Sequence, residues 1–203
     1  IADQGTRGSG PLRISDFLAR AVDRIDILFH SDQVITGLST AYKDLDEMTS
    51  GLQPADLVIV AGRPSMGKTT FAMNIAEHAA IQGDKPVLIF SMEMPGQALA
   101  MRMMSSLGRI DQHKIRTGKL ADEDWPRVTS AVSMLSEAKM FIDDTPALSP
   151  GEVRARARRV TKEQGALGLI VIDYIQLMQV PGSKENRTTE ISEISRGLKA
   201  LAK

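Results

Sequence analysis

A glycine-rich stretch of the chain has the residue types and the spacing of a phosphate-binding loop. Positions 62–69 match the pattern G-x-x-x-x-G-K-[ST], in which backbone N–H groups and a helix N-terminus together hold a triphosphate. Lys68 is expected to reach the β- and γ-phosphates, and the hydroxyl of Thr69 is expected to ligate Mg²⁺. The predicted nucleotide-binding residues are Gly62, Arg63, Pro64, Ser65, Met66, Gly67, Lys68, Thr69 and Thr70.

The segments on either side of this loop have the character that the motif requires. Residues 57–61 are apolar and β-branched, which predicts a buried strand leading into the loop. Residues 70–82 carry apolar side chains at helical spacing and are followed by Gly83, which predicts a helix that ends there. A chance match is the alternative, but it does not explain a strand and a helix in the right places. The sequence therefore predicts that the chain binds a nucleoside triphosphate.

Strand-like and helix-like segments alternate along the rest of the chain. Short apolar runs at 86–90, 140–142 and 169–173 predict further buried strands. The predicted helices cover about 97–107, a short stretch from 111, 122–138, 150–165 after a capping box at Ser149, and the residues from 188 onward. This alternation is typical of an α/β fold in which helices cover both faces of a mostly parallel sheet.

Two acidic residues follow predicted strands at the edge of the sheet where ligands bind in α/β proteins. Asp173 ends a run of four aliphatic residues and is expected to hold the Mg²⁺ shell from across the site. Glu93 follows the strand after the loop helix and could polarise the water that attacks the γ-phosphate. An ordinary surface glutamate in a turn is the alternative for Glu93, and its type and position alone do not decide between them.

Other polar residues near strand ends favour simpler roles. A turn or helix-capping role is favoured for Asp143 and Asp144, which also end a predicted strand. Gln176 lies just beyond Asp173 and could sense phosphate or contact a partner, or be a plain surface residue. The spacing of three basic residues on the predicted 150–165 helix could meet a phosphate backbone, although a solvated face is favoured; they are Arg154, Arg158 and Lys162.

Composition limits the class of protein. The chain has 203 residues, no cysteine, and 25 basic against 25 acidic residues. The zero net charge gives no sign of nucleic-acid binding, so any such contact must use a local patch. The lack of cysteine excludes disulfides and thiolate metal sites and fits a reducing compartment, the cytoplasm. Apolar runs are short and interrupted by charges, so no membrane contact is expected.

The N-terminal part has two sections ahead of the predicted domain. Residues 1–13 are rich in glycine and read as a flexible linker. Residues 14–30 form a predicted amphipathic linker helix, with an apolar stripe made by Ile14, Phe17, Leu18, Ala21, Val22, Ile25, Leu28 and Phe29. This stripe could pack on its own domain or dock on a neighbouring subunit, and both remain open at this point. The ATPase domain is expected over 31–203.

Several stretches of the chain together resemble the bacterial replicative DnaB helicase family. The resemblance covers about residues 14–203 and is far more specific than the phosphate loop alone. It is carried by 36–38, 45–46, 51–54, 61–71 (AGRPSMGKTTF), 90–95 (FSMEMP), 114–118, 154–159, 169–178 (LIVIDYIQLM) and 186–203. The resemblance implies a RecA-like P-loop NTPase domain preceded by a linker helix.

The resemblance also implies an activity and partners. It implies a ring-shaped homohexamer that hydrolyses ATP between subunits, moves along single-stranded DNA and works with a primase and a helicase loader. By the same resemblance, Lys68 and Thr69 match the family's triphosphate and Mg²⁺ residues, Asp173 its second Mg²⁺-site aspartate, and Glu93 its catalytic glutamate. The helix at 14–29 matches the segment that docks on the adjacent subunit. Arg102 matches an arginine of the family, without an assigned role.

The chain departs from the family pattern at both ends. The family's amino-terminal domain does not match any part of it, and the arginine finger and DNA-contacting loops are expected beyond Lys203. The 203 residues by themselves are therefore expected to hold the cis half of an ATP site and to hydrolyse ATP poorly. Two other functions remain as alternatives: another RecA-like ATPase of recombination or repair, and an ATP-binding oligomerisation module without motor activity.

Overall fold

The computed structural model describes residues 13–30, 35–180 and 186–203. The predicted flexible linker therefore lies outside the described residues except for its last position. Residues 181–185 lie outside them as well.

A parallel sheet forms the centre of the fold. Its strands are β1 (Val87–Ser91), β2 (Met140–Asp143) and β3 (Leu169–Asp173), in the order β2-β1-β3. Val87 is in register with Met140 on one side and with Leu169 on the other, so all three strands start at one edge and end at the opposite edge. The strands predicted from the apolar runs at 86–90, 140–142 and 169–173 are confirmed.

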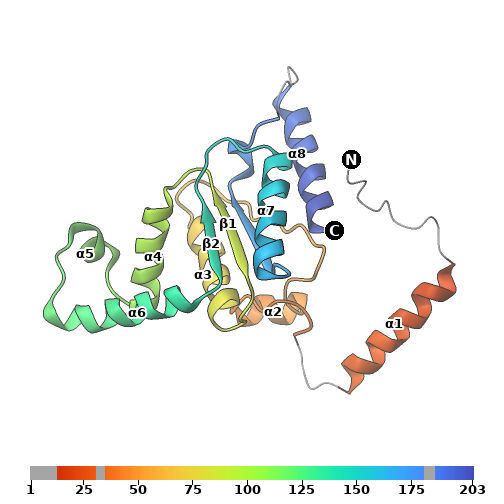
Figure 1. The fold of residues 1–203 in the computed structure, drawn as a ribbon, viewed down its shortest axis with the longest axis horizontal. Coiled ribbons are helices and arrows are strands. Elements are labelled where there is room, and N and C mark those ends of the chain that lie inside the picture. Colours follow the sequence, from red (N-terminus) through yellow and green to blue (C-terminus); the bar gives the residue numbers. More distant parts are fainter. Residues whose placement is uncertain (1–12, 31–34, 181–185) are drawn as a thin grey trace.

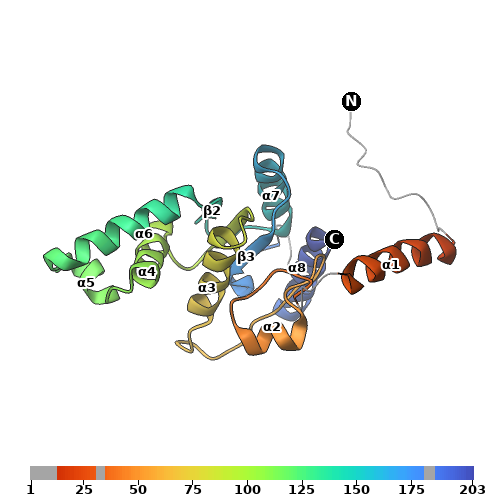
Figure 2. The same ribbon diagram turned by 90° about the horizontal axis from the view of Figure 1, so that it is seen from below.

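Helices cover both faces of this sheet, as the alternation predicts (Figure 1). One face is covered by α3 (Lys68–Ile81) and α4 (Gly96–Gly108), and the other by α7 (Pro150–Gln164) and α8 (Arg187–Ala202). Figure 2 shows these two layers on opposite sides of the strands. The α/β architecture with a parallel sheet between helical layers is confirmed.

The side chains of β1 divide the core into two clusters. Successive residues of a strand point to opposite faces, so Val87 and Ile89 pack with buried residues of α3 and α4. Leu88 and Phe90 pack instead with buried residues of α7 and α8. All five residues of β1 are buried, which explains why its sequence is continuously apolar rather than alternating.

Smaller elements complete the described part of the chain. They are α1 (Ile14–Phe29), α2 (Lys43–Thr49), α5 (Gln112–Thr117), α6 (Trp125–Glu137) and the 3₁₀ turns Asp122–Asp124 and Ile175–Leu177. The predicted capping box at the start of α7 is present, because Ser149 Oγ accepts from the N–H of Glu152 and Glu152 accepts from the N–H of Ser149.

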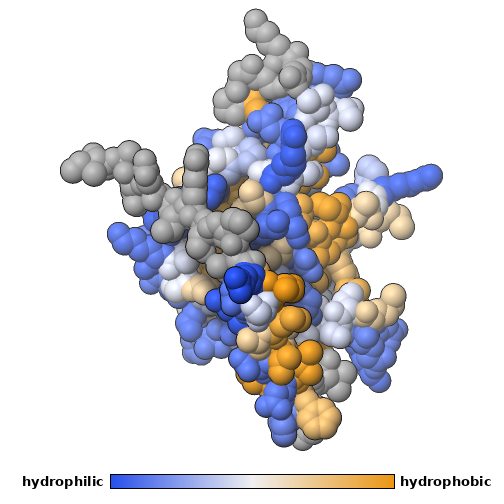
Figure 3. All heavy atoms as spheres, turned by 90° about the vertical axis from the view of Figure 1, so that its right-hand side faces the viewer, coloured by the Kyte–Doolittle hydropathy of each residue, from blue (hydrophilic) through white to orange (hydrophobic). Residues whose placement is uncertain are grey.

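Helix α1 has the predicted bounds and an exposed apolar stripe. None of its residues is buried, and Phe17, Val22 and Ile25 are 50%, 62% and 65% exposed. Figure 3 shows hydrophobic side chains gathered along this helix. The rest of the described chain leaves this stripe exposed. No helix in the described segments is long and apolar enough to cross a membrane.

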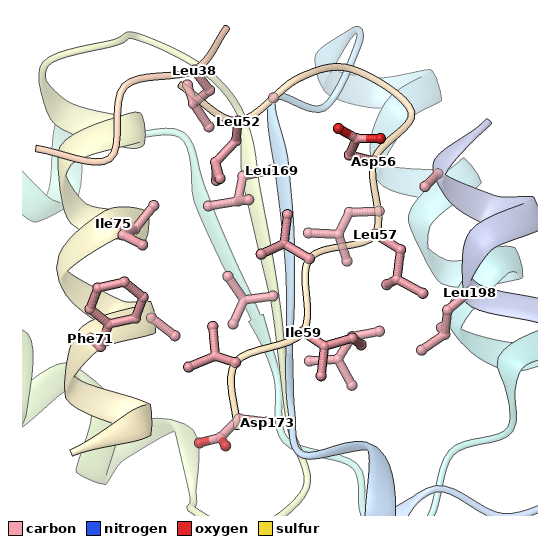
Figure 4. A pocket seen from close by; sticks show the side chains of 18 of the residues that line it. Leu38, Leu52, Asp56, Leu57, Ile59, Phe71, Ile75, Leu169, Asp173 and Leu198 are labelled. Carbon is pink, nitrogen blue, oxygen red and sulfur yellow. The ribbon is translucent and has the colours of Figure 1, made fainter. Parts of the chain in front are cut away.

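The predicted buried strand at 57–61 is wrong. The segment has no strand assignment, and Val58, Ile59 and Val60 are 56%, 57% and 46% exposed. It runs beside β3 without joining the sheet, with a cavity lined by both (Figure 4). β-branched residues favour a pleated, half-buried surface, but a strand also needs a neighbour that accepts its backbone hydrogen bonds. The residue types of this segment favour a strand, but the segment does not pair with a neighbouring strand.

Candidate active site

The phosphate-binding motif forms an irregular loop that leads directly into α3. Gly67 precedes the helix with φ of +86°, a left-handed conformation that side chains other than glycine rarely adopt. Inside the loop, the N–H of Met66 donates to the carbonyl oxygen of Arg63 at 3.3 Å. No side chain caps the N-terminus of α3, so its first N–H groups and the positive end of the helix dipole are available to an anion.

Lys68 is the first residue of α3, and its side chain folds back over the loop. Its Nζ donates to the carbonyl oxygens of Gly62 at 3.0 Å and of Arg63 at 3.2 Å. The ammonium group has three donors, so it is held at the mouth of the loop by two weak partners that a phosphate oxygen can replace. This position agrees with the role expected for Lys68.

Thr69 and Asp173 meet across the site although they lie on different elements. Thr69 Oγ1, on α3, donates to Asp173 Oδ2, at the end of β3, at 2.7 Å. Asp173 is only 7% exposed, and this hydroxyl is the partner of its buried carboxylate. The pair offers a hydroxyl and a carboxylate oxygen, the hard ligands that Mg²⁺ prefers. In the described part of the chain there is no group of three or more acidic, His or Cys side chains that could hold a metal ion.

The register of the sheet places Glu93 at the same edge. Ser91 pairs with Asp173, and the N–H of Met92 donates to the carbonyl oxygen of Asp173 at 2.9 Å. Glu93 comes next, is exposed, and lines the same cavity as Lys68, Thr69 and Asp173. The structure thus places Lys68, Thr69, Asp173 and Glu93 along one cavity, with Thr69 and Asp173 in direct contact.

Arg102 also lines this cavity. Its residue type and its spacing in the sequence did not predict a role for it. It lies on α4, with Nη1 3.5 Å from the hydroxyl oxygen of Thr70 on α3. Its buried Nε has no hydrogen-bond partner among the residues that the structure describes. A buried guanidinium donor without a partner is unusual in a folded protein. The only signal in the sequence is an arginine within a methionine-rich helix.

Asp143 and Asp144 have the structural roles that the sequence favoured. Asp144 Oδ2 accepts from the N–H of Gly96, the first residue of α4, at 2.8 Å. Asp143 forms an ion pair with Arg156 of α7 and accepts from the N–H of Thr145 at 3.1 Å. Burial alone would raise the pKa of Asp143, but the hydrogen bonds from Arg156 and Thr145 outweigh it and hold that pKa below its usual value.

The remaining candidates have no hydrogen bond to Lys68, Thr69 or Asp173 in the described part of the chain, although Gln176, Arg154 and Arg158 line the same large cavity. Gln176 is exposed, and its backbone carbonyl oxygen accepts from Arg187 at the start of α8. Three basic side chains of α7 are exposed, as expected for a solvated helix face. They are the residues whose spacing could meet a phosphate backbone: Arg154, Arg158 and Lys162.

Comparisons with known proteins agree with the fold and the motifs. The family model of the DnaB-like helicase C terminal domain matches residues 37–203. The chain is 55% identical to the replicative DNA helicase DnaB of Buchnera aphidicola subsp. Schizaphis graminum over 199 residues, which are 97% of this chain and 43% of that protein. It is 52% identical to the protein of the same name from Haemophilus influenzae, covering 100% of this chain and 44% of the relative.

Solved structures show the same likeness. A DnaB-like replicative helicase, solved for its interactions with primase, superposes with a TM-score of 0.83 at 30% identity and covers 97% of this chain and 47% of that one. A solved ATPase domain reaches a TM-score of 0.87 at 30% identity, with coverage of 96% and 68%. The chain spans less than half the length of the curated relatives. It belongs to the DnaB-like helicase C-terminal domain family.

Proposed function

We propose that this chain is the ATP-driven motor of a replicative DNA helicase. ATP binding and hydrolysis between subunits of a hexameric ring would drive translocation on single-stranded DNA and unwinding of duplex at the replication fork. The observation that carries the proposal is the 2.7 Å contact between Thr69 Oγ1 and Asp173 Oδ2 beside Lys68. It joins the two phosphate-site motifs of an ATPase, which are far apart in the sequence.

Each residue of the loop has a distinct task in this proposal. The backbone N–H groups between Gly62 and Thr70, which exclude Pro64, and the N-terminus of α3 would hold the phosphates, while Lys68 would exchange its carbonyl partners for β- and γ-phosphate oxygens. Thr69 and Asp173 would hold Mg²⁺, directly or through its water. When bound, Mg²⁺ neutralises charge that develops on the phosphate oxygens. The phosphate loop alone does not specify the base; ATP is inferred from the family.

Glu93 and Arg102 complete the proposed site. Glu93 is the residue that would orient and polarise the water attacking the γ-phosphate, because its carboxylate reaches the cavity from the end of β1. Arg102 faces the same cavity with a buried Nε that lacks a partner in the described segments. We assign it to the bound nucleotide, where it would add positive charge beside the loop.

The proposed assembly depends on α1. Its exposed apolar stripe would dock on the adjacent subunit, which links six ATPase domains, over 31–203, through their linker helices at 14–30. A solved DnaB-like helicase is described with its primase, and we extend that partner to this chain together with single-stranded DNA and a helicase loader. We extend the proposal to a cytoplasmic location.

The proposal is tested by measuring ATP hydrolysis by the full-length protein with and without single-stranded DNA. Lys68→Ala is the site variant, Lys43→Ala on α2 is the matched control, and mass measurement gives the oligomeric state. The proposal predicts DNA-stimulated turnover from a hexamer, lost in Lys68→Ala and kept in the control. Turnover that ignores DNA, or none from intact hexamer, would leave a nucleotide-binding oligomerisation module. DNA strand exchange without unwinding would indicate an ATPase of recombination.

A further inference from the structure

The turn that carries Glu93 is fixed at both ends, while the Glu93 side chain is left unrestrained. On one side, Ser91 Oγ donates to the carbonyl oxygen of Met94 at 2.7 Å and accepts from its N–H at 3.3 Å. On the other side, the N–H of Gly96 donates to Asp144 Oδ2 at 2.8 Å. Glu93 itself makes no hydrogen bond or ion pair with the described residues. Its position is therefore set by its backbone.

The second of these anchors comes from outside the helix that it caps. The residue before α4 is Pro95, which has no side-chain acceptor and makes no side-chain cap hydrogen bond. A helix leaves its first N–H groups without partners, and a carboxylate at that end also interacts favourably with the helix dipole. Asp144 provides both from the loop after β2. The start of α4 is thus held against a neighbouring strand by one side chain.

Asp144 is itself held in place. The preceding residue, Asp143, is bound by Arg156 and by the N–H of Thr145, so the backbone on both sides of Asp144 is anchored to α7. Arg156 also donates to Thr145 Oγ1 at 2.7 Å. Close packing adds to this anchor, since a Cβ on Gly96 would lie 3.4 Å from Ile142 and 3.5 Å from Asp144. A chain of contacts runs from α7 through the end of β2 to the Glu93 turn.

We propose that Asp144 is the positioning residue for Glu93: its carboxylate, bound to the N–H of Gly96, holds the turn that aims Glu93 at the attacking water. This inference rests on the role proposed above for Glu93. Water attack on phosphorus depends on alignment, and a shift of about 1 Å far from the chemistry can cost about 100-fold in rate. Removing Asp144 leaves the phosphate loop, Lys68 and the contact of Thr69 with Asp173 intact, so nucleotide binding is kept.

The test compares four variants of the full-length hexamer in the presence of single-stranded DNA. Asp144→Ala removes the acceptor, Asp144→Asn keeps an acceptor oxygen, and Glu93→Gln removes the proposed base. Asp84→Ala is the matched control, because it removes a surface carboxylate that is paired only with Lys139. For each variant, kcat and KM for ATP, the Kd of a fluorescent ATP analogue, and Tm are measured.

The expected result is a separation of turnover from binding. Asp144→Ala should lower kcat by between about 10- and 100-fold while the Kd of the analogue stays within about twofold of the original. Asp144→Asn should restore most of the lost kcat, since its amide oxygen can accept from Gly96. Asp84→Ala should match the unaltered protein. If Asp144 served only to cap α4, its removal would not lower kcat alone, and Asp144→Asn would not restore kcat alone.

Other outcomes overturn the inference in distinguishable ways. If Glu93→Gln is inactive and Asp144→Ala turns over at the normal rate, the positioning role is wrong and the proposed function stands. If kcat, nucleotide affinity and Tm all fall together in Asp144→Ala, the residue supports the fold and does not position Glu93. If Glu93→Gln hydrolyses ATP normally, the assignment of Glu93 fails, and Asp144 has no base to position.

Discussion

Thr69 donates a hydrogen bond to Asp173 at 2.7 Å although 104 positions of sequence separate the two residues. The contact exists because α3 begins and β3 ends at the site: Thr69 is the second residue of the helix, and Asp173 is the last residue of the strand. In a parallel α/β sheet this edge is where ligands bind. This hydrogen bond brings Thr69 and Asp173 together in one candidate site for Mg²⁺ and phosphate.

Replacement of Asp173 tests this centre. Asp173→Asn keeps the shape and the contact with Thr69 but removes the negative charge that a divalent cation requires. The Mg²⁺ concentration for half-maximal ATP hydrolysis should rise by about 10- to 100-fold. A titration of turnover against Mg²⁺ measures it, with the exposed Asp84→Asn as control. An unchanged Mg²⁺ requirement would remove Asp173 from the metal site.

Arg102 should contribute to nucleotide affinity. A hydrogen bond to a charged group is worth about 1.5–3 kcal/mol, so Arg102→Ala should weaken binding of an ATP analogue by about 10- to 100-fold. Arg102→Lys should recover part of the affinity, because it keeps the charge and loses the fork of donors. Equilibrium binding to the full-length protein measures both, and Arg127→Ala on the exposed side of α6 is the control. Equal affinity in all of these proteins would mean that Arg102 serves only to pack α4 on α3.

How much the sequence predicts depends on whether a feature is local. Helix α3 follows from apolar residues at helical spacing, strands β1 and β3 follow from short apolar runs, and Lys68 follows from a motif whose loop, helix and spacing lie within a few residues. The segment 57–61 fails because strand formation depends on a hydrogen-bonded neighbour that residue types do not specify. Such pairing is a property of the assembled sheet.

The site residues divide in the same way. Asp173 could be predicted because a run of aliphatic residues marks the strand that it ends. Arg102 and Asp144 could not be placed, since their importance comes from what α4 and the end of β2 bring beside them. A guanidinium in a methionine-rich helix and a second aspartate in a turn look ordinary until the fold supplies their neighbours.

Buried Glu77 on α3 makes stability depend on pH. Burial raises the pKa of Glu77, and the hydrogen bond from Ser106 lowers it only in part. A carboxyl group whose pKa is raised by folding gives stability that is present below the unfolded value, near 4.5, and is lost as the pH rises through the folded value. Glu77→Gln should therefore have a higher Tm than the unaltered protein at pH 7, by about 2–4 °C for each kcal/mol of stability gained. Its Tm should also depend less on pH between pH 4 and pH 8.

Thermal unfolding across this pH range measures the effect, with the exposed Glu137→Gln as control. The control should follow the unaltered protein at every pH. A lower Tm at pH 7 in Glu77→Gln would show that the ionised carboxylate is stabilising, and that its neighbours compensate for its burial.

Substitutions on α1 should dissociate the ring without harming the ATP site. Full burial of an apolar side chain is worth about 1.5–3 kcal/mol, so the double variant Phe17→Ser, Ile25→Ser should weaken each subunit contact by several kcal/mol. Mass measurement should then show smaller species that still bind an ATP analogue. Arg24→Ser, on the polar side of the same helix, should remain a hexamer. A double variant that stays hexameric would remove α1 from the interface.

The central claim is that ATP hydrolysis at this site powers strand separation. The most direct measurement is displacement of a labelled strand from a forked DNA duplex by the full-length hexamer, for the unaltered protein and for Glu93→Gln, with ATP binding checked in both. The account predicts ATP-dependent unwinding by the unaltered protein and none by Glu93→Gln, which should still bind ATP. Unwinding at the normal rate by Glu93→Gln, or ATP turnover by the unaltered hexamer without any unwinding, would contradict it.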